Sequence, residues 1–256
     1  MKKSAQTTAK LLPLLAVLFF ILLWDAGVRY YNTPAWILPS PGQVIKSVFT
    51  IHELLLMHTA TTLLEAGLGL LLAMLLAVLI AVLMDSIYWL KQALYPLVII
   101  SQTIPLIVLT VLFVIWFGFG MLPKILVVIL VCFFPILISL INGLESVDDD
   151  QIQLFRSMGA GRLAITKMVK IPAALPSFFS GLRISATYSI MGAIIGEWMG
   201  AEKGLGYFMT LAQKGYQVDQ VLAAVLVICL LSLLIVKIVD LMEYIFIPWN
   251  RWQMKG

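Results

Sequence analysis

Charged residues are scarce in this chain. Only 12% of its 256 residues are Asp, Glu, Lys or Arg, whereas about 25% is usual in a soluble domain, and 62% are hydrophobic. The low charge excludes an ordinary soluble domain, and the apolar content excludes a disordered chain. The sequence also lacks a dense basic run that could follow a phosphate backbone, so we expect no nucleic-acid partner.

Cysteine and histidine are almost absent as well. Cys132 and Cys229 both lie in apolar segments without metal-ligand spacing, so we expect small buried residues and no disulfide. His52 and His58 are six residues apart, which makes them poor metal ligands. No Ser/His/Asp set, no H-E-x-x-H and no G-x-x-x-x-G-K-[ST] loop occurs. These absences predict a chain that is not an enzyme and holds no cofactor or metal of its own.

Long hydrophobic segments fill most of the sequence. A bilayer core needs about 20 apolar residues per helix. Six segments meet this length: 11–28, 59–84, 92–117, 125–144, 177–195 and 221–247. We therefore predict an all-α integral membrane protein with six transmembrane helices in one domain, 11–247, with short ends at 1–10 and 248–256. The first segment follows Lys2 and Lys3 like a signal peptide but lacks a small-x-small cleavage site, so we expect it to be retained.

The distribution of Lys and Arg predicts the orientation. With the N-terminus in the cytoplasm, the inner segments hold ten basic residues and the outer segments 29–58, 118–124 and 196–220 hold five. Cytoplasmic loops carry an excess of Lys and Arg. We therefore expect both termini and the segment 147–176 on the cytoplasmic side of the membrane.

Segment 147–176, VDDDQIQLFRSMGAGRLAITKMVKIPAALP, is the one long polar interruption between hydrophobic segments. Its three aspartates suit a helix N-terminus, and Ile152, Phe155 and Met158 recur every three residues as one apolar face. Gly159 suits a left-handed turn. A second helix over 162–169 is expected to end before Pro172 and Pro176. This pattern predicts a cytoplasmic helix–turn–helix that either lies on lipid headgroups or docks into a groove of a soluble protein.

The same segment resembles the coupling loop of permease subunits of bacterial ATP-binding-cassette importers. Their pattern is E-A-A, three residues, Gly, nine residues, then I-x-L-P. Gly159, followed by Ala160, stands at the glycine, and Val169-Lys170-Ile171-Pro172 follows at the right spacing. The E-A-A positions hold Gln153-Leu154-Phe155, and this loss of the acid removes any salt bridge expected from it.

The resemblance extends over most of the chain. Leu38-Pro39-Ser40-Pro41 and Gly204-Leu205-Gly206-Tyr207 resemble the nitrate, sulfonate, taurine and thiamine-precursor branch. The run 154–159 in combination with the run 196–201 resembles permeases assigned to hydroxymethylpyrimidine-type thiamine precursors. The resemblance implies a type I importer-like permease that transports a hydroxymethylpyrimidine-type thiamine precursor, or else nitrate, a sulfonate or taurine. The alternative hypothesis is a protein of a different class, an ion-coupled secondary transporter.

The resemblance also implies partners. A second permease copy, giving a homodimer, would complete the pathway within the lipid of a bacterial plasma (inner) membrane. Two cytoplasmic ATPase subunits would bind ATP and Mg and would each receive one coupling helix, and an extracytoplasmic binding protein would deliver the solute. The expected coupling residues are Gln153, Leu154, Phe155, Met158, Gly159, Ala160, Val169, Ile171 and Pro172.

Polar side chains within or beside the spans are the candidates for the solute pathway. They are Gln102, Thr103, Glu65, Arg183, Tyr188, Glu197 and Trp198. A lone charge at the bilayer centre costs about 2.5–3.5 kcal/mol on insertion scales, so Glu65 and Arg183 should face other helices or a water-filled cavity. For both residues, a structural ion pair and a pathway role stay open. Likewise, Glu197 and Trp198 either sit at the membrane interface or contact a polar heterocycle.

Overall fold

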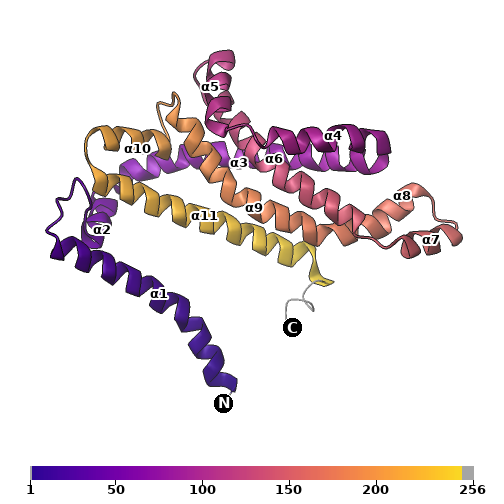
Figure 1. Cartoon of the computed structure of the whole chain (residues 1–256), viewed down its shortest axis with the longest axis horizontal. Coiled ribbons are helices and arrows are strands. Elements are labelled where there is room, and N and C mark those ends of the chain that lie inside the picture. Colours follow the sequence, from indigo (N-terminus) through magenta and orange to yellow (C-terminus); the bar gives the residue numbers. More distant parts are fainter. Residues whose placement is uncertain (1, 250–256) are drawn as a thin grey trace. The chain divides into compact units, whose positions relative to one another are not determined.

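The computed structural model describes residues 2–249, with the side chains of residues 2–11 and 14 excepted. The described chain is built from helices (Figure 1). They are α1 (Lys2–Tyr30), α2 (Pro41–Thr50), α3 (His52–Ser86), α4 (Tyr88–Ser101), α5 (Leu106–Phe117), α6 (Met121–Glu145), α7 (Asp149–Ser157), α8 (Arg162–Ile165), the π-helical turn η1 (Thr166–Lys170), α9 (Ile171–Trp198), α10 (Leu205–Lys214) and α11 (Val218–Phe246). The predicted C-terminal tail lies, from residue 250 on, outside the described residues.

Four of the described helices are long and apolar enough to cross a membrane: α3, α6, the continuous Arg162–Trp198 and α11. The pair α4 and α5 counts as a fifth if it forms one span. The predicted span 11–28 lies within α1, where part of the side chains is not described. The all-α membrane architecture is confirmed, but the predicted number of six spans is not reproduced as such.

The chain divides into two compact units. One unit contains the residues up to 58 together with 208–227, and the other contains 59–207 and the residues from 228 onward. In the first unit, α2 begins with a capping box, in which the Ser40 side chain and the Gln43 side chain each bond the other's backbone N–H. Ser47 of α2 also donates a hydrogen bond to Asp219 at the start of α11.

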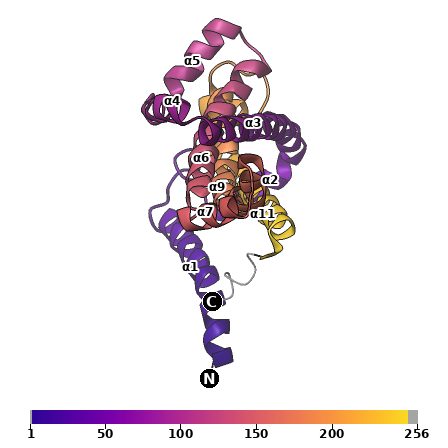
Figure 2. The ribbon, with the colours of Figure 1, turned by 90° about the vertical axis from the view of Figure 1, so that its right-hand side faces the viewer.

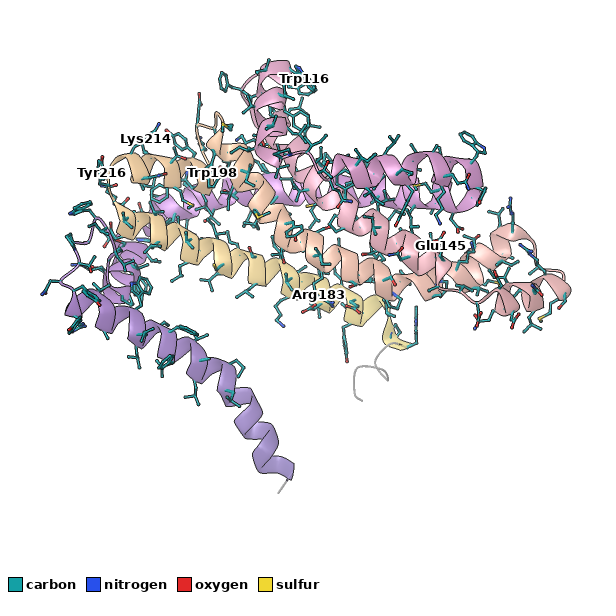
Figure 3. All side chains as sticks on the ribbon, in the orientation of Figure 1. Trp116, Glu145, Arg183, Trp198, Lys214 and Tyr216 are labelled. Atoms are coloured by element: carbon teal, nitrogen blue, oxygen red, sulfur yellow. The ribbon has the colours of Figure 1, made fainter. Side chains whose placement is uncertain are left out.

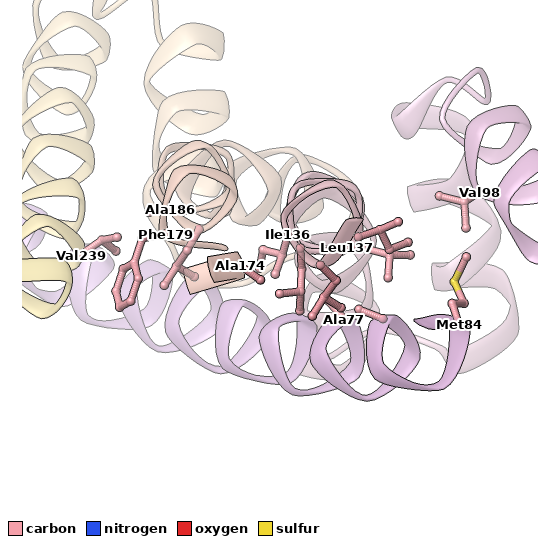
Figure 4. Packing of buried hydrophobic residues seen from close by; sticks show 14 of the residues in the cluster. Ala77, Met84, Val98, Ile136, Leu137, Ala174, Phe179, Ala186 and Val239 are labelled. Atoms are coloured by element: carbon pink, nitrogen blue, oxygen red, sulfur yellow. The ribbon is translucent and has the colours of Figure 1, made fainter. Parts of the chain in front are cut away.

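The core of the second unit lies around α6 and α9. These two helices run side by side in both ribbon views (Figures 1 and 2). Buried side chains from α3, α4, α6, α9 and α11 form one hydrophobic cluster (Figure 4). It includes Ala77, Met84, Val98, Ile136, Leu137, Ala174, Phe179, Ala186 and Val239. The outward faces of these helices keep large apolar side chains exposed, as suits helices that meet lipid or another membrane subunit.

Small residues let the helices of this unit approach closely. A Cβ added to Gly181 would lie 2.6 Å from the Pro135 carbonyl oxygen, and one on Gly143 would lie 2.8 Å from Ser177 Cβ. Gly192 and Gly196, predicted to share one side of the fifth span, both face α6 at Val128 and Lys124. Packing by small residues is the usual way in which membrane helices associate, because lipid provides no hydrophobic drive.

The third predicted span is broken. Residues 92–117 were expected to form one helix, but α4 ends at Ser101 and α5 begins at Leu106, with a bend of 99° between them (Figures 1 and 2). Pro105 lacks a backbone N–H, and the hydroxyls of Ser101 and Thr103 bond back to the carbonyls of Val98 and Ile100. These side chains satisfy the backbone locally, so the helix can stop inside the apolar run.

The expected end of the second loop helix at Pro172 and Pro176 is also wrong. Helix α8 passes through η1 directly into α9, so the chain is helical from Arg162 to Trp198. Pro172 lies in the first turn of α9, where a proline needs no N–H partner. The π turn before Pro172 contains one residue more than an α-helical turn. Such turns occur inside α-helices where the regular hydrogen-bond pattern is interrupted, for example next to a proline.

The predicted loop 118–124 is shorter than expected. Helix α6 already begins at Met121, so Lys124 lies inside a helix and is buried. Gly118 and Gly120, both with positive φ, form the turn that precedes it.

Candidate functional site

Six of the seven predicted pathway residues fall into three separate places in the second unit, and Trp198 lies apart from them. Gln102, Thr103 and Tyr188 line one cavity. Glu65 and Glu197 belong to a buried polar cluster at the far end of α9. Arg183 lies where α9 meets α11 (Figure 3). The structure therefore does not bring the seven candidates together as a single site.

The first place is the break between α4 and α5. A cavity of about 380 Å³ opens there, lined on the other side by α6 and by Tyr188 of α9. Its polar groups come from Ser101, Gln102, Thr103 and Tyr188, and all of them are uncharged. Gln102 and Thr103 are exposed in the single chain although they lie in the middle of an apolar segment. Such side chains are unfavourable against lipid, so they suit a water-filled passage or a subunit contact.

The hydrogen bonds at this break leave capacity for a ligand. The hydroxyls of Ser101 and Thr103 donate to backbone carbonyls at 2.8 and 2.7 Å, so their oxygens can still accept. The Gln102 amide reaches the Val98 carbonyl only at 3.5 Å, which is a weak contact. Broken helices with free polar groups at mid-membrane are a recurring way to build solute sites in transporters.

The second place is a buried cluster around Glu197, which is only 1% exposed. One carboxylate oxygen accepts the Thr62 hydroxyl at 2.7 Å, and the other accepts the Gly206 N–H at 2.5 Å. Thr62 in turn accepts the Leu205 N–H at 2.9 Å. The carboxylate therefore fixes the start of α10 and the preceding loop to α3 and α9 (we call these four residues the Glu197 cluster).

The loop has room for Glu197 only because of its glycines. A Cβ on Gly204, whose φ is +114°, would lie 2.2 Å from the Glu197 carboxyl carbon. A Cβ on Gly206 would lie 2.6 Å from the Ile194 carbonyl oxygen. The Gly-Leu-Gly-Tyr run is therefore explained by its contact with Glu197.

Glu65 forms an ion pair beside this cluster. Lys124 of α6 donates to Glu65 Oε1 at 2.5 Å, and both side chains are at least nine-tenths buried. A buried pair of this kind is strongly destabilised when one partner is removed, by about 3–5 kcal/mol. The geometry therefore supports the interpretation of Glu65 as a member of a structural ion pair. Its second oxygen, Oε2, is buried without a hydrogen-bond partner among the described residues.

Arg183 also has acidic partners. Its Nε donates to Asp240 at 2.7 Å and its NH2 group donates to Glu243 at 2.5 Å, both on α11. These bonds join α9 to α11 in the half of the helices nearest the coupling loop. Trp198 at the end of α9 (Figure 3) is 46% exposed and does not line the cavity at the α4–α5 break.

The predicted coupling loop lies at the opposite end of α9 from the Glu197 cluster. Gly159 has a φ of +84°, as expected, and the N–H of Ala160 bonds the Phe155 carbonyl to close the end of α7. The predicted apolar face is only partly one surface, because Ile152 and Phe155 are half-buried whereas Met158, its third member, is exposed. Leu154, Leu163 and Met168 are exposed apolar side chains as well. The three-residue spacing therefore predicts the first two positions as an inward face but not the exposed apolar surface of the loop.

The other expected coupling residues lie further along the same helical run. Val169 and Pro172 are half-buried, and Ile171 and Gln153 are exposed. Lys170 donates to Asp85 at the end of α3 at 2.6 Å. This ion pair ties the π turn to α3, and a cavity of about 300 Å³ beside it is lined by Arg156 and Arg162.

Several residues of these sites were not anticipated. Their role is visible only in the structure, from their hydrogen bonds and ion pairs with side chains on other helices. They are Thr62, Asp85, Lys124 and Glu243. Gly204 and Gly206, which follow Glu197 closely, are the sequence signal that could have indicated a close contact there. Among the described residues, no group of three or more His, Cys, Asp or Glu is arranged to hold a metal.

Comparisons with known proteins agree with the observed fold. Residues 69–252 match the family described as "Binding-protein-dependent transport system inner membrane component". A "Probable ABC transporter permease protein" of Haemophilus influenzae is 38% identical, over 93% of this chain and 97% of its own length. "Formylaminopyrimidine transport permease protein ThiX" of Halalkalibacterium halodurans is 35% identical, over 99% and 100%. "Taurine transport system permease protein TauC" of Escherichia coli is 29% identical, over 92% and 88%.

A solved structure shows the same fold. A chain of the MetNI methionine ABC transporter, in an inward-facing conformation, superposes with a TM-score of 0.61 and 20% identity, covering 77% of this chain and 96% of that one. The family match covers more than half of the chain, and the two relatives above 30% identity cover 93% and 99% of it. The chain therefore belongs to the binding-protein-dependent inner membrane components, as an ABC transporter permease subunit that has ATPase partners and is not itself an enzyme.

Proposed function

We propose that this permease imports a hydroxymethylpyrimidine-type thiamine precursor. The observation that carries the proposal is the similarity, over nearly the whole of both chains, to a permease named for formylaminopyrimidine transport. A solute of that class is small, neutral and planar, with nitrogen and hydroxyl groups that both donate and accept hydrogen bonds.

The cavity at the α4–α5 break supports this solute class. Its polar groups, from Gln102, Thr103 and Tyr188, carry no charge and can both donate and accept. The cavity is open in the single chain, and a second copy of the permease would close it and complete the pathway. We therefore propose that the working pathway is a homodimer with these residues along it.

The exposed apolar side chains of the coupling loop support the proposal that the ATPase subunits drive transport through this loop. Each of two ATPase subunits would receive α7 and the following turn in a groove, with Leu154 and Met158 as the exposed apolar contacts. An extracytoplasmic binding protein would deliver solute at the other end of the helices, near the loop 199–206. This arrangement requires the coupling loop to be cytoplasmic, as the distribution of Lys and Arg predicts.

The orientation can be tested with single cysteines in a Cys229→Ser background. Leu163→Cys, at a highly exposed position of the coupling loop, should react with a membrane-impermeant thiol reagent only when the cytoplasmic side is open. Gln213→Cys in α10 should react from outside intact cells. The reverse pattern would contradict the proposed direction of transport.

A second candidate solute is taurine or another sulfonate, because a taurine permease is also a relative. The α4–α5 cavity argues against it, since no Lys or Arg lines that cavity and a sulfonate is an anion. The third hypothesis, an ion-coupled secondary transporter, predicts that the permease transports solute without any ATPase.

Reconstitution separates these readings. The permease, its ATPase and its binding protein would be placed in liposomes, and uptake of radiolabelled hydroxymethylpyrimidine and of taurine would be measured with and without ATP. We expect ATP-dependent uptake of the pyrimidine alone. Uptake of taurine instead would overturn the proposed solute, and ion-driven flux without the ATPase would overturn the proposed energy source.

A further inference from the structure

We propose that the cavity between the coupling loop and the end of α3 binds the phosphate of an anionic phospholipid headgroup, which ties α7 to the membrane surface. The cavity has a volume of about 300 Å³. It is lined by the last two residues of α3, by one side of α7, and by α8 and η1, all within the second unit. The proposal goes beyond the importer function, because it concerns neither the solute nor its pathway, and takes from that function only the role of α7 in binding the ATPase.

Two arginines give this cavity an unbalanced positive charge. Arg156 of α7, Arg162 of α8 and Lys170 of η1 line it, and the acidic residue among the lining residues is Asp85. Asp85 is already paired with Lys170 at 2.6 Å. Neither arginine forms an ion pair with the side chains that the structure describes. Three cations and one carboxylate therefore leave a formal charge of +2, carried by two guanidinium groups.

A phosphodiester with free hydroxyls suits the polar groups of the cavity. A guanidinium binds phosphate oxygens through two parallel N–H bonds, which are stronger than bonds between neutral groups. The hydroxyl of Thr166 lines the same cavity and can donate a further bond. The Ser86 hydroxyl donates to the Val82 carbonyl at 2.8 Å, so its oxygen can still accept a bond. Phosphatidylglycerol offers both a phosphate and hydroxyl donors.

The cavity lies where membrane-spanning helices leave the bilayer. Helix α3, which is long and apolar enough to cross a membrane, ends at Ser86. The helical run 162–198 has 37 residues, whereas a bilayer core needs about 20, so its charged first turns project beyond the hydrocarbon. Tyr88 and Trp89 are both exposed just after Ser86, as is typical of the headgroup region. Basic pockets between membrane helices at this depth are suited to anionic headgroups.

The cavity is on the opposite side of α7 from the proposed ATPase contact. Ile152 and Arg156 line the cavity and are four residues apart, so they share one side of the helix. Leu154 is exposed and lies two residues from each of them, which corresponds to a rotation of about 200° around the helix axis. A lipid in the cavity and an ATPase against Leu154 can therefore bind at the same time. The sequence left lipid contact and protein docking as alternatives for this loop, and we assign them to opposite sides of α7.

A bound headgroup would hold α7 in position for the ATPase. None of the residues of α7 is buried, so packing within the chain fixes this helix only weakly. A phosphate that joins Arg156 to Arg162 and to the end of α3 adds charged hydrogen bonds that the chain alone does not supply. A zwitterionic lipid is a poorer ligand, because its own cation would meet the two arginines.

Photo-crosslinking tests the site. The permease with its ATPase subunits would be placed in phosphatidylcholine nanodiscs containing a trace of phosphatidylglycerol with a photoactivatable group near its headgroup. Mass spectrometry should find label on peptides from 152–170 and from the end of α3. Unlabelled phosphatidylglycerol should suppress this label about tenfold at roughly ten times its half-saturating fraction, whereas phosphatidylcholine should not. Equal suppression by inorganic phosphate would identify a site for free phosphate and overturn the assignment to lipid.

Substitutions assign the label to the two guanidinium groups. Arg156→Gln and Arg162→Gln should each lower labelling by roughly tenfold or more at a low fraction of phosphatidylglycerol, because charged hydrogen bonds are lost. Lys167→Gln is the matched control. It removes one positive charge from an exposed position of the same helical run that does not line the cavity, so most of the labelling should remain. Equal losses in the three variants would show a general attraction of basic residues to anionic lipid and refute the cavity as the site.

The competing occupant of the cavity is a carboxylate of the ATPase. In that case phosphatidylglycerol would not label the cavity, and Arg156→Gln would release the ATPase in every lipid mixture. Our proposal expects the ATPase to stay bound in the double variant Arg156→Gln/Arg162→Gln. It also expects ATP-driven uptake by the parent protein to rise with the fraction of phosphatidylglycerol, and uptake by the double variant not to respond.

The labelling experiment needs no solute, so its result is independent of the proposed function. If the cavity is labelled but no pyrimidine is imported, the proposed solute fails and the lipid site stands. If the pyrimidine is imported and phosphatidylglycerol does not label the cavity, the lipid site is refuted and the function stands.

Discussion

Glu197 and Gly204 show how strongly one buried carboxylate constrains its neighbours. The Glu197 side chain occupies the space in which a Cβ at position 204 would lie, and the loop is shaped so that backbone N–H groups face the carboxylate. Glycine is needed at position 204 for two independent reasons. Its φ of +114° is unfavourable for other residues, and Glu197 leaves no space for any side chain there. Each reason can be tested separately.

Gly204→Ala should destabilise the protein markedly. Backbone strain at a positive φ contributes about 1–2 kcal/mol, and forcing a methyl group against Glu197 adds about 1–3 kcal/mol as in an overpacked core. The expected result is a lower melting temperature in detergent, together with loss of transport. Thermal unfolding followed by size-exclusion chromatography measures the first effect.

Gly118→Ala is the matched control. Gly118 also has a positive φ, +75°, but an added Cβ would meet nothing within 4 Å. It should show the backbone strain alone and therefore a smaller loss of stability than Gly204→Ala. Equal losses in the two variants would mean that the contact with Glu197 is unimportant.

At the scale of helices, Gly69 of α3 marks the contact with α6. A Cβ there would lie 2.4 Å from Val128 Cβ, whereas one on Gly67, two residues earlier, would meet nothing within 4 Å. Gly69→Ala should therefore push α3 away from α6 and lower the melting temperature. Gly67→Ala should leave it unchanged or raise it, because alanine favours a helix over glycine by about 1 kcal/mol. A loss of stability in Gly67→Ala that matched Gly69→Ala would contradict this packing.

The ion pair between Lys170 and Asp85 connects the coupling loop to α3. Its charges are partly buried, so either single reversal, Asp85→Lys or Lys170→Asp, should reduce stability and uptake. The double exchange should recover much of both, with a coupling energy of about 0.5–3 kcal/mol. A double-mutant cycle on unfolding and on ATP-driven uptake gives that energy. Additive losses would show that the two residues do not act through each other.

The sequence predicted helices better than it predicted their interruptions. Continuous apolar runs identified α3, α6 and α11, because the length of an apolar run is a direct consequence of the bilayer thickness. The break at Gln102 to Pro105 was missed because polar residues and a proline are individually tolerated inside membrane helices. The continuation of the helix through Pro172 was not predicted, because it depends on the π turn before the proline and no residue pattern indicates such a turn.

The polar sites were predictable only in part. The sequence predicts Gln102, Thr103 and Tyr188 as candidates because they are uncharged polar groups within apolar spans, and all three line one cavity. The partners of Glu65 and Arg183 were not predictable, because Lys124, Asp240 and Glu243 lie on other helices at distances along the chain that no periodicity fixes. Pairings across a helix bundle depend on packing, which a single sequence does not contain.

At the scale of the whole molecule, an importer needs a mechanical connection between its ATPase and the membrane helices. We infer that the continuous helix from Arg162 to Trp198 provides it within this chain, because the helix begins at the predicted coupling loop and its last turn contains Glu197. Gly159 forms the turn that joins α7 to this helix. A change in that turn should reorient α7 without altering the helices that insert in the membrane.

Gly159→Val should therefore abolish ATP-driven uptake and leave the inserted protein intact. The position has free space around it but a φ of +84°, which is especially unfavourable for a β-branched residue, so the turn would have to change. Uptake into vesicles and the amount of folded permease measure the two effects.

Gly161→Val gives the matched control two residues away. Gly161 also has free space, but its φ of −73° suits any residue. It should transport nearly as well as the parent protein, because neither volume nor backbone conformation opposes valine there. If Gly159→Val transported equally well, the left-handed turn would not be needed to present α7 to the ATPase. The force would then have to enter the membrane helices by another route.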